Sequence, residues 1–194
     1  MTGVTLGVAA LIVVLSVMNG FYDFVRDLLV SIDPHVRVVG TDASGVANAD
    51  SLVALAREMD EVVAAAPYVE GKALLVHDGG PANRVVVVRG VDPATMADET
   101  EVVQQTGFGS FDVSTRNGVP GLVAGMGLGN RLGLYPGGSN RSASNVGVLS
   151  APSIERMLTQ VFGVPPVRRF EVRGLFEVQA AFDQSHVFIG LEEA

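Results

Sequence analysis

The sequence predicts an α+β protein in which an N-terminal transmembrane helix and its stalk precede a domain of mixed helices and strands. Residues 1–22 contain no charged side chain, and the first charge in the chain is Asp23. Residues 36–89 show the order strand, helix, strand, strand, which is half of a split α+β sandwich. Residues 121–189 show short apolar runs between turn residues, which indicate further strands.

The uncharged residues 1–22 are long enough to form most of a membrane-spanning helix, which needs about 20 apolar residues at ~1.5 Å each. A cleaved signal peptide would show a basic leader and a small-residue cleavage site, and neither is evident. A buried core helix is the other alternative, but such helices seldom run this far without a charge. The missing basic flank indicates that the natural chain begins before Met1.

The first helix is expected to continue as an amphipathic stalk to Ile32, with Phe24 and Leu28 along one face. Asp33-Pro34 should end it, because proline removes a backbone donor and disfavours helix at the preceding residue. Residues 35–40 then read as a strand.

A helix is predicted over residues 52–66, with Asp50 or Ser51 as its N-cap and Pro67 after its end. Residues 72–77 and 84–89 are predicted to form two strands of a hairpin, because glycine and proline residues lie between them. This order completes the half sandwich.

The second half of the chain is predicted to be rich in strands. Residues 94–119 read as mostly irregular, and a short helix is expected near residues 128–132. The longest strand pattern, residues 169–178, should kink at Gly174, because glycine weakens a strand interior. The remaining strands are expected at residues 121–124, 145–149 and 186–189.

Composition narrows the class of partner. The formal charge is −8, from 13 Lys and Arg against 21 Asp and Glu. This acidic balance argues against nucleic acid, whose phosphates require clustered cations. The chain has no cysteine, which excludes disulfides and thiolate chemistry.

The sequence offers no positive indication of a catalytic residue, a cofactor or a metal. Residues 125–129 have the spacing G-x-G-x-G rather than the G-x-G-x-x-G of a dinucleotide site, and an acid on a following strand end is missing. We therefore interpret this run as a strand-to-helix turn. A P-loop is absent, so ATP-driven work would require another polypeptide.

The connection at residues 150–168 joins two strands, is too long for a tight hairpin and is strongly apolar. Long apolar connections either pack on their own domain or bind a partner, and the sequence leaves both alternatives open. The apolar side chains at helical spacing are Ile154, Met157, Leu158, Val161 and Phe162.

Four segments, taken together, resemble a known family. They are GVTLGVAALIVVLSVMNGF, VVVRGVDP, GLVAGMGLGNRLGLYPGG and RRFEVRGLFEVQAAFDQSHVFIGLEEA. In this order they resemble the LolC/LolE permease subunits of the bacterial lipoprotein-releasing ABC transporter. The resemblance implies an N-terminal piece of a subunit with four membrane helices and an inserted periplasmic domain of MacB-like type.

The resemblance also implies a division of the chain. Residues 1–32 would be the first membrane helix and stalk, and residues 33–93 the first half of a porter-like α/β subdomain. Residues 94–194 would be a β-rich lobe, and the connection at residues 150–168 would contact a carrier. The chain would lie in the inner membrane, with most of its residues in the periplasm.

The implied partners are an ABC ATPase subunit, a second permease subunit, a LolA-like periplasmic carrier and the lipoprotein substrate. Acyl contact in such a subunit points to four apolar residues of the helix and stalk; contact with ordinary lipid or another helix is the alternative. The four residues are Met18, Phe21, Phe24 and Leu28.

Two other functions fit the same layout. One is a MacB-like efflux permease that transmits mechanical motion and lacks a carrier-binding hook. The other is a membrane-tethered periplasmic binding or scaffolding module without a transporter.

Overall fold

The computed structural model describes residues 2–30, 34, 36–40, 45–78, 83–96, 101–138, 142–151, 153 and 167–194. The chain is divided into two compact units, Met1–Val46 and Ala47–Ala194. We call the second unit the core domain. Each unit is described by itself below.

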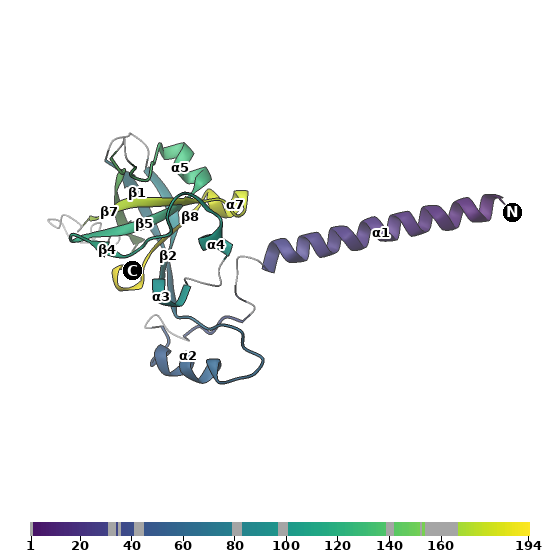
Figure 1. The fold of residues 1–194 in the computed structure, drawn as a ribbon, viewed down its shortest axis with the longest axis horizontal. Helices are drawn as coiled ribbons and strands as arrows, with labels where there is room; N and C mark the ends of the chain where they lie inside the picture. The colour runs from purple at the N-terminus through teal and green to yellow at the C-terminus, as the bar shows by residue number, and fades with distance from the viewer. Residues whose placement is uncertain are drawn as a thin grey trace. The chain divides into compact units, whose positions relative to one another are not determined.

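The first unit contains helix α1 (Thr2–Val30), the long helix in Figure 1. Within α1, the span Gly3–Tyr22 has a mean hydropathy of 2.2, and none of it is buried. By length and composition this span fits a membrane crossing. The helix also continues beyond it, as predicted for the stalk.

The strand prediction for residues 35–40 is wrong over residues 36–40, the part of it that the structure describes. These residues are not in a regular element, and Val36, Val38 and Val39 are exposed. An alternating apolar segment becomes a strand only when another strand supplies hydrogen-bond partners. No strand pairing is recorded for these residues in the described part of the chain.

Helix α2 (Ala49–Arg57) begins earlier and ends earlier than predicted. Its N-cap is Asn48, in the left-handed conformation, rather than Asp50 or Ser51. After the helix the chain folds back, because the Arg57 guanidinium donates hydrogen bonds to the Ala65 carbonyl at 2.8 and 3.1 Å. Residues 58–66 therefore leave the helical path that their apolar spacing predicts.

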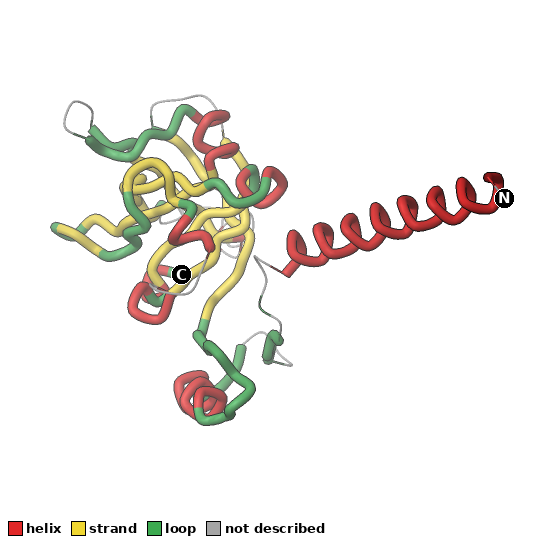
Figure 2. Tube along the Cα trace, turned by 45° about the vertical axis from the view of Figure 1, so that its right-hand side comes forward, coloured by secondary structure: helices red, strands yellow, loops and turns green. Residues whose placement is uncertain are grey.

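The core domain is built on strands, shown in yellow in Figure 2. The hairpin prediction is confirmed, since β1 (Tyr68–His77) and β2 (Asn83–Val91) pair antiparallel; their loop residues 79–82 lie outside the described residues. The later strands are also confirmed, with bounds shifted by up to two residues. They are β5 (Val119–Gly125), β6 (Asn145–Ser150), β7 (Arg168–Phe176) and β8 (His186–Gly190).

Residues 94–119 contain more regular structure than predicted. They hold most of α3 (Pro93–Met96), and also α4 (Glu101–Gln104), β3 (Thr106–Gly109) and β4 (Thr115–Arg116). Each element is four residues or shorter, so no periodic pattern has room to develop. The pairing of β3 with β7 and of β4 with β5 fixes both strands in place.

The sheet closes on itself. Its strand order is β3-β7-β6-β1-β2-β8-β5-β4, and β5 also pairs with β7. The strands β7, β6, β1, β2, β8 and β5 therefore form a barrel, which removes most free edges. Strands on both sides of residue 93 share this barrel; the division of the chain at that residue stays a prediction.

Alternate side chains of the barrel strands point inward and form one hydrophobic core. Helix α5 (Met126–Leu132), predicted near residues 128–132, adds Leu128 and Leu132 to it. The strand residues of the core include Ala73, Leu75, Val86, Val88, Leu122, Ala124, Val146, Phe170, Val172, Val187 and Ile189.

Candidate membrane-contact and partner-contact surfaces

Helix α1 presents the first group of predicted contact residues. Met18 is 60% exposed and Phe21 is 64% exposed, and they are one helical turn apart. Phe24 and Leu28 lie further along the same helix, but their side chains lie outside the described part of the structure. The helix therefore offers free apolar side chains near the end of its membrane span.

The second group of predicted contact residues, Ile154, Met157, Leu158, Val161 and Phe162, lies outside the described residues. Their connection leaves β6 after Ser150 and enters β7 at Arg168. These two strands are antiparallel neighbours, so both ends of the connection lie at the same end of the barrel.

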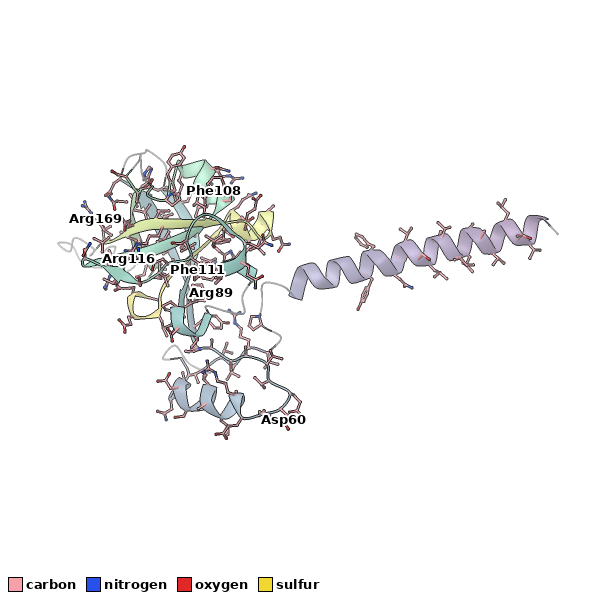
Figure 3. The ribbon with its side chains drawn as sticks, in the orientation of Figure 1. Asp60, Arg89, Phe108, Phe111, Arg116 and Arg169 are labelled. Carbon is pink, nitrogen blue, oxygen red and sulfur yellow. The ribbon has the colours of Figure 1, made fainter. Side chains whose placement is uncertain are left out.

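Arginines gather at the barrel end from which this connection emerges. Strands β5 and β7 run parallel, so β4, paired to the start of β5, lies at the same end as the start of β7. Figure 3 shows Arg116 of β4 and Arg169 of β7 at this end. The third arginine is Arg168, which pairs with Glu193. Arg116 pairs with Asp112 and Arg169 with Asp78.

A buried arginine lies behind this end of the barrel. The β5–β7 register passes from Val172 to Gly174, so Arg173 is an extra residue in β7, a β-bulge. The bulge aims the Arg173 side chain, only 7% exposed, at the segment before β5. Its guanidinium donates to Asp112 Oδ2 at 3.0 Å, to the Ser114 carbonyl at 2.6 Å and to the Val119 carbonyl at 3.0 Å.

The Arg173 network affects the acidity of Asp112. Burial works against ionisation of this carboxyl. The Ser114 hydroxyl and backbone amide, followed by Arg173 and Arg116, outweigh it and lower the pKa of Asp112. Asp112 is therefore a firmly ionised anchor that holds two arginines.

Asp183 shows the opposite behaviour at the end of α7 (Ala180–Asp183). The residue is 3% exposed, and its Oδ1 accepts hydrogen bonds from the amides of Val178 and Gln179 at 3.1 and 3.4 Å. Burial raises the pKa of Asp183, and the nearby Glu177 carboxylate adds to the effect. The carboxyl closes the turn between β7 and α7.

The glycine run at residues 125–129 serves close packing. A Cβ at Gly125 would collide with the Asp183 carbonyl oxygen. A Cβ at Gly127 would lie 2.8 Å from Gln184 Cγ, and one at Gly129 would lie 2.9 Å from Leu175 Cδ2. These three positions let α5 approach α7 and β7 closely, which explains the run without a nucleotide.

An aromatic cluster covers the outer face of β7 and β8. Phe188 lies edge-on to Phe111 and Phe176, with ring centroids 5.6 and 5.4 Å apart, and Phe182 stacks on His186 at 3.8 Å. Arg89, labelled beside Phe111 in Figure 3, pairs with Glu70 at 2.6 Å.

The Arg89 guanidinium also lies 5.9 Å from the centroid of the Phe182 ring. This arginine therefore links the start of β1, through Glu70, to α7. Sequence reasoning missed both Arg89 and Arg173, because an arginine in a strand usually faces water. Each of them precedes a glycine and lies in a segment that resembles the LolC/LolE family, and these were the available signals.

Comparison with known proteins identifies the family of the chain. The family model of the MacB-like periplasmic core domain matches residues 1–194. The chain is 32% identical over 193 residues to the lipoprotein-releasing system transmembrane protein LolC of Neisseria meningitidis serogroup B, covering 95% of this chain and 43% of the relative.

The chain is also 34% identical over 176 residues to proteins of the same name from two strains of Xylella fastidiosa, Temecula1 and 9a5c. These matches cover 91% of this chain and 39% of each relative. The chain thus spans about two fifths of the length of the curated relatives it matches. It belongs to the family of the MacB-like periplasmic core domain, and the predicted resemblance to LolC/LolE permeases is confirmed.

Proposed function

We propose that this chain is part of the permease subunit of an ABC transporter that extracts lipoproteins from the inner membrane and passes them to a periplasmic carrier. The observation that supports the proposal best is the match to LolC proteins along 91–95% of the chain. The apolar helix and the MacB-like core domain fit a subunit anchored in the inner membrane, with most of this chain in the periplasm.

In this proposal the transporter divides its work among subunits. A separate ATPase subunit hydrolyses ATP, a second permease subunit completes the membrane part, and a LolA-like carrier accepts the lipoprotein. Residues 33–93 are assigned to a porter-like subdomain, and residues 94–194 to a β-rich lobe that includes the carrier-binding connection at residues 150–168. The proposal assigns this chain no catalytic residue and no cofactor.

The proposed acyl contact is made by Met18, Phe21, Phe24 and Leu28. The exposed side chains of Met18 and Phe21 support it, because removing apolar surface from water stabilises contact with an acyl chain. Photo-crosslinkers at Phe21 and Phe24 in the full-length permease should label lipoprotein. Asn19 is a matched control at similar depth, since residues two positions apart in a helix face nearly opposite sides. Labelling of phospholipid or partner helices alone would reject the acyl contact.

The proposed carrier contact is the connection at residues 150–168. Its two ends, Ser150 of β6 and Arg168 of β7, lie at the arginine-rich end of the barrel, and this placement supports the proposal. Deleting residues 152–166 should abolish capture of the full-length permease by purified carrier. Replacing the two-residue turn at residues 117–118 with Gly-Gly is the control. Capture that survives the deletion would show that the carrier binds elsewhere.

A MacB-like efflux permease is the second candidate, because the matching family model carries that name. The two functions can be distinguished by a complementation experiment in bacterial cells from which the native lipoprotein-releasing permease has been depleted. The full-length gene with its ATPase should restore growth and outer-membrane lipoproteins. Increased drug resistance without restored growth would favour efflux.

A further inference from the structure

The turn between β4 and β5 consists of Asn117 and Gly118. The strands pair Arg116 with Val119 and Thr115 with Pro120, so the loop has two residues. Both have positive φ angles, 52° for Asn117 and 79° for Gly118, as the mirror-image hairpin turn requires. Both residues are exposed.

From this geometry we infer that Asn117 is a site of spontaneous deamidation. The Gly118 backbone nitrogen loses its proton and attacks Asn117 Cγ, ammonia leaves, and a five-membered succinimide forms. Water then opens either carbonyl of the ring and gives aspartate or isoaspartate. The balance is one water consumed and one ammonia released, with no oxidant or other reactant.

Three features of the site favour this reaction. Gly118 has no side chain to hinder ring closure, and the exposed turn gives water access. In a two-residue hairpin the ladder bonds join the flanking residues, Arg116 and Val119, so the Gly118 nitrogen lies outside the ladder. Strand β4 has only two residues, so the local opening that brings nitrogen and Cγ together costs little free energy.

The chain contains an internal control, because its other Asn-Gly pair is Asn19-Gly20. That pair lies inside α1, where the amide of Gly20 donates to the carbonyl four residues earlier. It also lies in the apolar span Gly3–Tyr22, where a bilayer would exclude the water that opens the ring. The same dipeptide should therefore react at residue 117 and be protected at residue 19.

Aspartate or isoaspartate at residue 117 would change the charge and the strand pairing at the arginine-rich end of the barrel. A new carboxylate appears next to Arg116, which already pairs with Asp112. Isoaspartate also adds one backbone atom to a two-residue turn, and this disrupts the pairing of Thr115 with Pro120. Thr115 donates to Glu193 at 3.3 Å, so the disturbance reaches the partner of Arg168.

The test is to incubate the full-length permease in lipid at mildly alkaline pH and to map its peptides by mass over time. Isoaspartate is measured in parallel as methyl acceptance with an isoaspartyl methyltransferase. We expect deamidation at Asn117 to be several-fold faster than at Asn19 in the folded protein, and similar at both sites in denaturant. The Asn117→Gln variant, whose ring closure is slower, should lose most methyl acceptance.

Equal rates at the two sites in the folded protein would overturn the inference. So would an unchanged Asn117 over a period in which the denatured protein reacts. Should Asn117→Gln fail to fold, the comparison within the wild-type chain decides alone.

Discussion

At the scale of single residues, Arg173 shows how one buried charge organises an end of the barrel. Its guanidinium joins β7 to the carbonyls of Ser114 and Val119 and to the carboxylate of Asp112. Gly121 allows this close packing, since a Cβ there would collide with the Asp112 carbonyl oxygen and lie 3.0 Å from Arg173 Nη1. The position was not predictable, because the bulge that aims the side chain inward depends on pairing with a distant strand.

Replacing Arg173 with Met should destabilise the core domain by about 3 kcal/mol. The substitution removes one ion-pair partner of the Asp112 carboxylate and leaves the carbonyls of Ser114 and Val119 without their hydrogen-bond donor. Chemical denaturation of the protein in detergent measures the change. Arg168→Met, on the same strand but 58% exposed at its side chain, is the control and should cost less than about 1 kcal/mol. Equal losses for the two variants would contradict the role of Arg173.

The contributions of Asp183 and Asp112 to the free energy of unfolding should depend on pH in opposite directions. The pKa of Asp183 is raised above its ordinary value of 3.8 in the folded state, so the folded state binds the proton more tightly than the unfolded state. Its contribution is full below 3.8 and is lost as pH rises through the folded pKa. Wild type should therefore lose stability relative to Asp183→Asn as the pH rises above 3.8.

For Asp112 the folded pKa is lowered, so its contribution is present above 3.8 and is lost as pH falls below that value. Wild type should lose stability relative to Asp112→Asn on acidification. Unfolding free energies of both variants across this range check the signs. Parallel trends in the two variants would show that one assignment is wrong.

At the scale of elements, local pattern predicted the elements and distant contacts decided their limits. The β1–β2 hairpin, strands β5 to β8 and helix α5 follow from apolar runs and turn residues. Residues 36–40 fail as a strand because nothing described pairs with them, and α2 stops early because Arg57 binds the Ala65 carbonyl. The kink predicted at Gly174 corresponds to the observed bulge.

The close packing of α5 can be tested with two glycines. Gly125→Ala should lower stability, because its Cβ would meet the backbone of Asp183, which cannot move aside cheaply. Gly71→Ala in β1 is the matched control, since nothing lies within 4 Å of a Cβ there. Alanine at this position should raise stability slightly, because it lowers the conformational entropy of the unfolded chain. Thermal unfolding of the two variants should shift in opposite directions. A neutral Gly125→Ala would show that α5 does not need the close approach.

At the scale of the whole molecule, neither barrel closure nor the candidate contact surfaces could be predicted completely. Closure depends on two parallel pairings, β2 with β8 and β5 with β7, between strands far apart in the sequence. Local periodicity contains no information about such partners. The apolar residues of α1 were predictable from hydropathy, whereas the arginine-rich end became visible only when β4, β5 and β7 came together.

We propose that this chain belongs to a permease that hands lipoproteins to a carrier. Proteoliposomes containing the full-length permease, its ATPase and a labelled lipoprotein measure this directly. We expect lipoprotein to enter the soluble fraction only with both ATP and carrier present, and the deletion of residues 152–166 to prevent it. Release that is independent of the carrier, or that is unchanged by omitting the permease, would contradict the claim.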